Sequence, residues 1–192
     1  MIQTTIVDDH PAVRAGLAAL VAREPGFILA ADVGTAAEAL GAVQRLSMDL
    51  VIADYHLVDG DGIALCRTLK RRHACRHAVL YSAFADERLA VAAAVAGLDG
   101  VIHKGVPAPA LFDRLREVVR GRGGLPAISP ATLAVVSEAL PPEHAPIVGM
   151  RIDGASEPEV ADALRISLAD AEQRIEQIVA QLKPRRPSVV PA

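Results

Sequence analysis

The sequence predicts an α/β domain followed by a small all-helical domain. Five short apolar runs alternate with helix-like stretches up to residue 120, glycines and prolines break this pattern near residues 122–130, and only helix-like stretches follow. With 192 residues, of which 52% are hydrophobic and 22% charged, the chain can bury a sizeable core. We therefore expect two folded units.

The first unit, expected over residues 1–121, has the pattern of a parallel sheet covered by helices. Buried strands are expected at residues 2–7, 28–33, 50–53, 79–81 and 101–102. Helices are expected at residues 12–23, 36–46, 63–72, 87–96 and 108–120, with Thr35 and Glu38 as a capping box for the second. The alternation implies a doubly wound sheet with right-handed crossovers, in which ligand chemistry sits at the carboxyl ends of the strands.

The rest of the chain divides into a linker and leading helix at residues 122–137, a helical domain at 138–183 and a flexible, proline-rich tail at 184–192. Helix-like stretches lie at residues 131–139, 141–152, 157–164 and 168–182. Ser156 with Glu159 and Ser167 with Asp170 resemble capping boxes, and the tight turn between these two helices is typical of a helix-turn-helix. Pro146 should kink or shorten its helix, at a cost of about 3 kcal/mol, unless it lies in the first turn.

Composition and motifs exclude several classes of protein. The longest stretch without a charged residue, residues 123–137, is too short for a membrane span, and the first residues lack a signal-peptide pattern, so we expect a cytoplasmic protein with no membrane association. Cys66 and Cys75 lack metal-binding spacing and are expected to be reduced thiols. The chain has no Walker loop, no GxGxxG after a strand, no HExxH and no GxSxG, so these enzyme signatures are absent from the sequence.

Acidic residues follow two of the expected strands. Asp8 and Asp9 come after the first strand and Asp54 after the third, so the topology brings three carboxylates to one edge of the sheet. Clustered carboxylates repel one another unless a cation neutralises them, and oxygen ligands suit Mg²⁺. Ser82 and Lys104 end the fourth and fifth strands at the same edge. The set suits Asp54 as a nucleophile that accepts a phosphoryl group, while Mg²⁺ and Lys104 stabilise the charge.

Two motifs give the chain a resemblance to a known family. Residues 7–17 resemble VDDHP-x-VR-x-GL and residues 54–62 resemble D-Y-x-L-P-x-x-D-G, two motifs of two-component response regulators of the NarL/LuxR type. The resemblance covers nearly the whole chain. It implies a flavodoxin-like (βα)5 receiver domain with parallel strand order 2-1-3-4-5, followed by a LuxR-type helix-turn-helix domain.

The resemblance also implies a role for each residue of the acidic pocket. Asp54 accepts the phosphoryl group from a cognate histidine kinase, Lys104 contacts the phosphoryl oxygens and Ser82 is the switch hydroxyl. The expected ligands of Mg²⁺ are Asp9, Asp54 and the backbone carbonyl of His56, with Asp8 contributing through water. Because phosphoryl acceptance is a self-modification, we do not expect an enzyme.

Two positions of the first domain depart from the family pattern. Val58 stands where proline is usual, and Val101 stands three residues before Lys104, where relatives have tyrosine or phenylalanine. Valine cannot swing an aromatic ring inward, so the aromatic half of the usual switch, at Val101, is missing. We expect activation to rely on Ser82 and to involve a small rearrangement.

The helical domain matches the LuxR-type scaffold over residues 140–182, but its DNA-facing side is unusual. At positions 169, 170 and 172–174, where relatives usually offer lysine, threonine, lysine and asparagine or histidine, this chain has Ala, Asp, Glu, Gln and Arg. Residues 137–182 contain three arginines and nine acids, a net charge of −6. Such a surface attracts phosphates weakly. The possible DNA contacts are Gln173, Arg174 and Lys183.

Three hypotheses follow for the output of the chain. The first is a phosphorylation-controlled regulator of transcription that acts as a homodimer on DNA. The second is a protein-interaction or dimerisation regulator whose helix-turn-helix has lost autonomous DNA binding, as the acidic last helix suggests. The third is a phosphate sink without an output partner. A salt titration of binding to duplex DNA separates the first two.

Overall fold

The computed structural model describes residues 1–42 and 48–183. The first domain contains, in chain order, β1 (Ile2–Val7), α1 (Pro11–Arg23), β2 (Phe27–Val33), α2 (Ala36–Ala42), β3 (Met48–Ala53), β4 (His56–Leu57), β5 (Gly60–Asp61), α3 (Gly62–Arg71), β6 (Cys75–Ser82), α4 (Glu87–Ala96), β7 (Gly100–His103) and α5 (Ala108–Val119). The second part contains α6 (Pro130–Ala139), the short 3-10 helix η1 (Pro142–His144), α7 (Ala145–Ile152), α8 (Glu157–Leu164) and α9 (Leu168–Leu182).

The main sheet has five parallel strands in the order β2-β1-β3-β6-β7. Counted among these five strands alone, the order is 2-1-3-4-5, which confirms the prediction. The register places Val7 opposite Ala53, and the backbone N–H of Asp54 donates to the carbonyl of Val7 at 2.7 Å. The first residues beyond β1 and β3 therefore lie next to each other at the carboxyl edge of the sheet.

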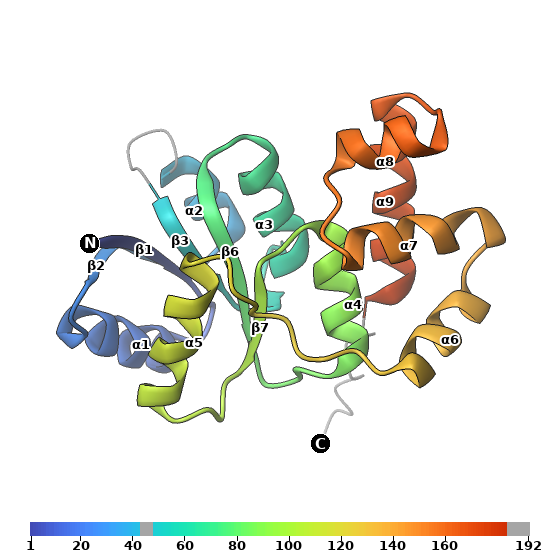
Figure 1. Cartoon of the computed structure of the whole chain (residues 1–192). Helices are drawn as coiled ribbons and strands as arrows, with labels where there is room; N and C mark the ends of the chain where they lie inside the picture. The colour runs from blue at the N-terminus through green and yellow to red at the C-terminus, as the bar shows by residue number, and fades with distance from the viewer. Residues whose placement is uncertain (43–47, 184–192) are drawn as a thin grey trace, which may run out of the picture.

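Helices cover both faces of this sheet (Figure 1). Helices α1 and α5 pack on one face, where Leu17, Val21, Phe112 and Leu115 belong to one buried cluster. Helices α2, α3 and α4 pack on the other. The second buried cluster includes residues of these helices together with residues of α7, α8 and α9, so the helical domain shares a core with the first domain.

The expected helices are present, and two local features differ from expectation. Residues 141–152 form η1 and α7 instead of one helix, because Pro146 lies in the first turn of α7, where its missing N–H costs no helical hydrogen bond. The hairpin of β4 and β5 was not predicted. The expected end of the second helix, residues 43–46, and the tail at 184–192 lie outside the described residues.

The expected helix starts in the last domain have the predicted caps. The hydroxyl of Ser156 accepts from the backbone N–H of Glu159, whose carboxylate accepts in return from the N–H of Ser156, which completes a capping box. The hydroxyl of Ser167 accepts from the N–H of Asp170. Only residues 165–167 separate α8 from α9, as in a helix-turn-helix. Within residues 1–42 and 48–183, no helix has the length and apolar character needed to cross a membrane.

Candidate functional site at the carboxyl edge of the sheet

Lys104 joins two of the carboxylates at this edge. Its Nζ atom lies 2.7 Å from Oδ2 of Asp8 and 2.9 Å from Oδ2 of Asp54, and both aspartates are buried. Burial alone would lower the pKa of the Lys104 ammonium, but its hydrogen bonds and attraction to Asp8 and Asp54 raise it above the ordinary value. Lys104 is thus a fixed positive charge beside the carboxylate of Asp54.

The acidic cluster has the donor atoms of a metal site. One ligand atom each from Asp8, Asp9, His10 and Asp54 can be chosen so that all four lie within 4.8 Å of one another. The three carboxylates supply the hard oxygen ligands that Mg²⁺ prefers, and Asp9, at 24% side-chain exposure, is open to solvent. The residues present therefore fit a divalent cation.

His10 also belongs to this cluster, although it is not among the ligands predicted from the sequence. Its Nδ1 atom lies 2.7 Å from Oδ1 of Asp9, and its backbone N–H donates to Oδ1 of Asp8 at 2.9 Å. The residue occupies the N-cap position of α1, but its side chain makes no capping hydrogen bond. The available signal was its position directly after the two acids.

The loop after Asp54 is held in place by close backbone packing. His56 begins β4 and pairs with Asp61 in the small hairpin, and the N–H of Gly62 donates to the carbonyl of Tyr55 at 2.9 Å. A Cβ atom on Gly62 would lie 2.1 Å from the carbonyl oxygen of Asp54. Glycine at position 62 therefore lets the start of α3 approach the backbone of Asp54.

Ser82 and Lys104 are neighbours at the ends of β6 and β7. The register pairs Ser82 with His103, and the N–H of Lys104 donates to the carbonyl of Ser82 at 2.8 Å. The hydroxyl of Ser82 is buried and accepts from the N–H of Phe84 at 3.1 Å. The switch hydroxyl predicted from the sequence thus lies at the start of the loop that leads into α4.

Val101 lies in the core of the sheet, away from the solvent. It is 1% exposed in β7 and pairs with Leu80. An aromatic side chain does lie near Lys104: the hydroxyl of Tyr81 donates to the Lys104 carbonyl at 3.1 Å. This contact was not predicted from the sequence, because Tyr81 resembles an ordinary strand residue.

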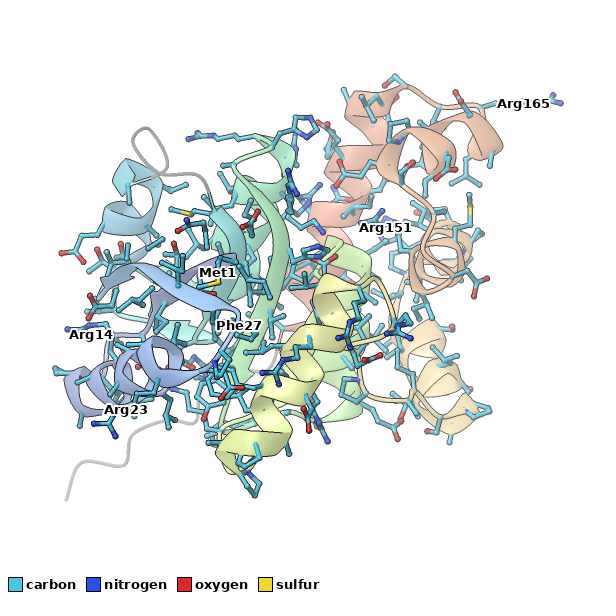
Figure 2. The ribbon with its side chains drawn as sticks, turned by 60° about the vertical axis from the view of Figure 1, so that its left-hand side comes forward. Met1, Arg14, Arg23, Phe27, Arg151 and Arg165 are labelled. Atoms are coloured by element: carbon cyan, nitrogen blue, oxygen red, sulfur yellow. The ribbon has the colours of Figure 1, made fainter. Side chains whose placement is uncertain are left out.

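Two of the residues expected to contact DNA lie in α9, and the third, Lys183, directly follows this helix. Gln173 is exposed and Arg174 is partly exposed. The Nζ atom of Lys183 lies 2.8 Å from Oδ2 of Asp61 in the first domain. Of the three arginines in the helical domain, Arg165 extends outward from the turn before α9, whereas Arg151 lies between the two domains (Figure 2). The structure does not join these residues into one basic surface.

The sheet order, the acids at its carboxyl edge and the lysine beside them define the class of receiver domains. The response regulator receiver domain family matches residues 4–116, so the chain belongs to this family. It is a two-component response regulator of the NarL/LuxR type, as its motifs predicted.

Similar proteins cover between 71% and 96% of the chain. The DNA-binding transcriptional activator DevR/DosR of Mycobacterium tuberculosis is 24% identical, over 95% of this chain and 88% of its own length. A LuxR-family response regulator from Aurantimonas is 26% identical with a TM-score of 0.59, over 71% of this chain and 95% of that one. A structure of two RcsB dimers bound to two parallel DNAs has 16% identity and a TM-score of 0.60, over 96% and 94% of the two chains.

Proposed function

We propose that Asp54 accepts a phosphoryl group from a histidine kinase and that this modification controls transcription through the helical domain. The contact of Lys104 with Asp54 at 2.9 Å, beside the carboxylate of Asp8, is the observation that carries the proposal. A buried carboxylate, a fixed cation and a candidate metal site lie together at one edge of the sheet, which supports phosphoryl acceptance by Asp54. Lys104, Ser82 and the backbone carbonyl of His56 would act on the same phosphoryl group or its metal ion.

The proposed transfer forms one bond and breaks one. A carboxylate oxygen of Asp54 attacks the phosphorus of the phosphohistidine, the P–O bond forms, the P–N bond breaks and the imidazole leaves with its electron pair. Lys104 neutralises the phosphoryl oxygens, and Ser82 turns its hydroxyl from the N–H of Phe84 to donate to them. Mg²⁺, held by Asp9, Asp54 and the His56 carbonyl with Asp8 through water, would add charge neutralisation of the same oxygens.

Phosphorylation by a small donor tests this part of the proposal without the unidentified kinase. The protein is incubated with acetyl phosphate and Mg²⁺, and its intact mass is measured. We expect the mass of one phosphoryl group on the wild-type chain and on Asp59→Asn, an exposed acid of the same loop, and none on Asp54→Asn. Equal phosphorylation of the Asp54→Asn variant would contradict the proposal.

The output proposed for the chain is sequence-specific DNA binding by a homodimer. The tight turn between α8 and α9 supports a helix-turn-helix, and the relatives include a DNA-binding activator and RcsB dimers on DNA. These relatives do not favour the second hypothesis, an interaction module without DNA binding. The contact residues we propose are Gln173, Arg174 and Lys183.

Selection from a random duplex library tests the output. The phosphorylated protein should enrich two half-sites separated by about one helical turn, and Gln173→Ala should weaken binding to the enriched sequence. Because α9 carries few cations, we expect a shallow dependence of affinity on salt. Failure to enrich any sequence would contradict DNA binding as the output.

A further inference from the structure

The side chain of His10 faces the three carboxylates of the pocket. Its Nδ1 atom lies 2.7 Å from Oδ1 of Asp9, 3.5 Å from Oδ1 of Asp8 and 3.9 Å from Oδ2 of Asp54. In an octahedral site with metal–ligand bonds of about 2.1 Å, neighbouring ligand atoms lie about 3 Å apart and opposite ones about 4.2 Å apart. The three observed distances span a similar range, so an ion held by the acids can also reach Nδ1 of His10.

The contact between His10 and Asp9 is not a hydrogen bond. The Oδ1 atom of Asp9 is buried, and within residues 1–42 and 48–183 it has no hydrogen-bond partner, although Nδ1 of His10 lies 2.7 Å away. The imidazole N–H is therefore not directed at this oxygen, as it would be in an ordinary ion pair. A buried carboxylate oxygen without a partner is costly. A cation is the partner that both atoms can share.

The backbone around His10 fixes the position of this side chain. Pro11 restricts the residue before it to extended backbone, and His10 has a φ of −88° and a ψ of 106°. The N–H of His10 donates to Oδ1 of Asp8 at 2.9 Å, and the guanidinium of Arg14 donates to the carbonyl of Asp8 at 2.6 Å. Because the imidazole makes no capping hydrogen bond to α1, no structural contact there diverts it from the pocket.

An imidazole ligand changes which metal ion a site prefers. Mg²⁺ is held by oxygen ligands, whereas imidazole nitrogen suits first-row transition ions such as Fe²⁺, Ni²⁺ and Zn²⁺. A nitrogen ligand added to a set of carboxylates therefore raises the affinity for transition ions more than the affinity for Mg²⁺. The side chain of His10 is 67% exposed, so the ring lies at the mouth of the pocket, where an ion enters from solvent.

We propose that Nδ1 of His10 is a ligand of the metal ion and makes the pocket selective for a divalent transition ion over Mg²⁺. Asp9 and Asp54 supply anionic oxygens to this ion, and His10 supplies the nitrogen. The inference rests on the proposed function of the same pocket, because the ion is the one that would neutralise the phosphoryl oxygens. His10 is thus a residue that determines metal specificity.

Titration calorimetry of the full chain with Co²⁺ and with Mg²⁺ tests the inference without a phosphoryl donor. His10→Ala should lower the affinity for Co²⁺ by at least about tenfold, the low end of what even outer-sphere partners of a metal contribute. The affinity for Mg²⁺ should change much less, so the ratio of the two affinities falls. The matched control is His73→Asn, which removes an exposed histidine outside the pocket and should leave both affinities unchanged, since asparagine tolerates the φ of 53° at this position.

A spectroscopic measurement separates coordination by His10 from an indirect effect. In protein with ¹⁵N-labelled histidine rings, pulsed electron paramagnetic resonance of bound Mn²⁺ should detect coupling to a ring nitrogen in the wild type and in His73→Asn, but not in His10→Ala. Absence of this coupling from the wild type, or an unchanged ratio of Co²⁺ to Mg²⁺ affinity in His10→Ala, would overturn the inference. An equal rise of both affinities in His10→Ala would also reject it, because His10 would then be a competing cation.

Failure of this inference can be told apart from failure of the proposed function. Wild-type protein that binds Co²⁺ through His10 but accepts no phosphoryl group from acetyl phosphate and Mg²⁺ would contradict the proposed function alone. Protein that is phosphorylated on Asp54 but whose affinity for Co²⁺ does not depend on His10 would contradict the metal specificity alone.

Discussion

The Nζ atom of Lys104 lies 2.9 Å from Oδ2 of Asp54, across the carboxyl edge of the sheet from β7 to β3. Asp54 is 6% exposed, so its carboxylate is largely withdrawn from water and depends on this ammonium. The same ammonium also contacts Asp8. One lysine therefore holds two buried acids together, which explains how the site can fold before a metal ion binds.

Replacing Lys104 should destabilise the metal-free protein. Lys104→Met leaves Asp8 and Asp54 without their cation, and we expect the free energy of unfolding to fall by about 2 kcal/mol, with most of the loss recovered in Mg²⁺. Urea unfolding with EDTA and with Mg²⁺ measures both values. Lys70→Met is the matched control: it removes an ion pair with Asp99 near the surface, so the loss should be below about 1 kcal/mol and insensitive to Mg²⁺.

Two glycine variants should change stability in opposite directions. In Gly62→Ala, the new Cβ meets the carbonyl of Asp54 at 2.1 Å, so we expect a loss of about 3 kcal/mol in the free energy of unfolding. Gly16 lies exposed in α1 with open space around it, and Gly16→Ala should stabilise the protein by about 0.5 kcal/mol. Equal stability of Gly62→Ala and wild type in urea unfolding would show that the loop after Asp54 is not tightly packed.

The two cysteines should resist alkylation in the native protein. Both are free and buried, and burial raises the pKa of the Cys75 thiol to about 11 and the pKa of Cys66 well above its ordinary value. Because the thiolate is the reactive form, iodoacetamide labelling of Cys75 should be slow at pH 8 and rise about tenfold per pH unit toward pH 11.

The same pKa shift has a consequence for stability. The folded chain keeps a proton on Cys75 that the unfolded chain releases. The contribution of Cys75 to the free energy of unfolding is therefore complete below the pKa of the unfolded chain and is lost as the pH rises through the pKa of the folded chain.

Mass spectrometry of labelled protein, with a urea-unfolded control that should react fully, measures the reactivity of the two cysteines. Rapid labelling of both cysteines at pH 8 in native buffer would contradict their burial.

Activation should pass through Ser82 and α4 with little movement of β7. Val101 is already fully packed and carries no ring that can turn inward. Glu87, at the start of α4, accepts hydrogen bonds from the backbone and hydroxyl of Ser129 at 2.9 and 2.7 Å, so a shift of this turn reaches α6. Adding beryllofluoride should change amide hydrogen exchange in the 82–88 segment and at the start of α6, and Ser82→Ala should abolish the change. A large change confined to β7 would contradict this route.

The sequence predicted the pocket because its parts depend on regular structure. Once the apolar runs are taken as parallel strands, Asp8, Asp54 and Lys104 must follow strand ends at the same edge of the sheet. The register of β1 and β3 then places Asp8 and Asp54 side by side. The side chain of His10 could not be placed in this way, because its direction depends on the turn into α1 and not on strand periodicity.

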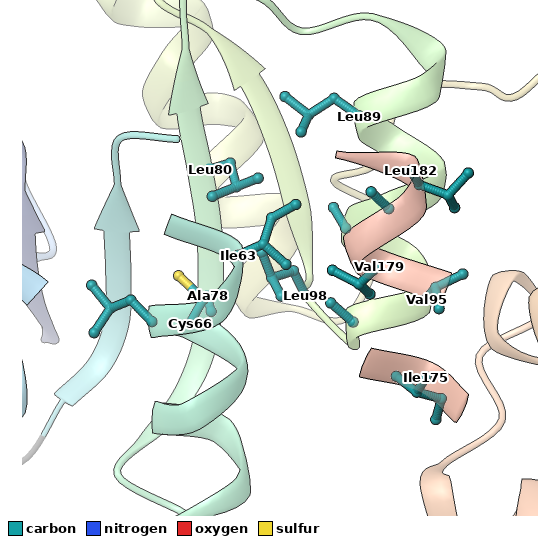
Figure 3. Packing of buried hydrophobic residues seen from close by; sticks show 14 of the residues in the cluster. Ile63, Cys66, Ala78, Leu80, Leu89, Val95, Leu98, Ile175, Val179 and Leu182 are labelled. Atoms are coloured by element: carbon teal, nitrogen blue, oxygen red, sulfur yellow. The ribbon is translucent and has the colours of Figure 1, made fainter. Parts of the chain in front are cut away.

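The contact between the domains could not be predicted from local patterns. Arg67 and Arg71 have the spacing of an ordinary charged face on α3, and the acids of α9 resemble a solvated helix face. Only the tertiary structure pairs these two faces, through contacts of Arg71 with Glu172 and of Arg67 with Glu176. The apolar run of α4 from Leu89 to Ala96 was the available signal, since a helical stretch without a polar side requires a second cover, which α9 supplies (Figure 3).

Locating the phosphoryl group directly tests the central claim. The protein is treated with acetyl phosphate and Mg²⁺, the acyl phosphate is trapped by reduction with borohydride, and the modified residue is identified by peptide mass spectrometry. We predict modification at Asp54 alone, lost when EDTA replaces Mg²⁺ and reduced in Lys104→Met. Modification at another residue, or modification of Asp54 that is indifferent to Mg²⁺ and to Lys104, would contradict a phosphoryl site built from the acids and the lysine at this edge of the sheet.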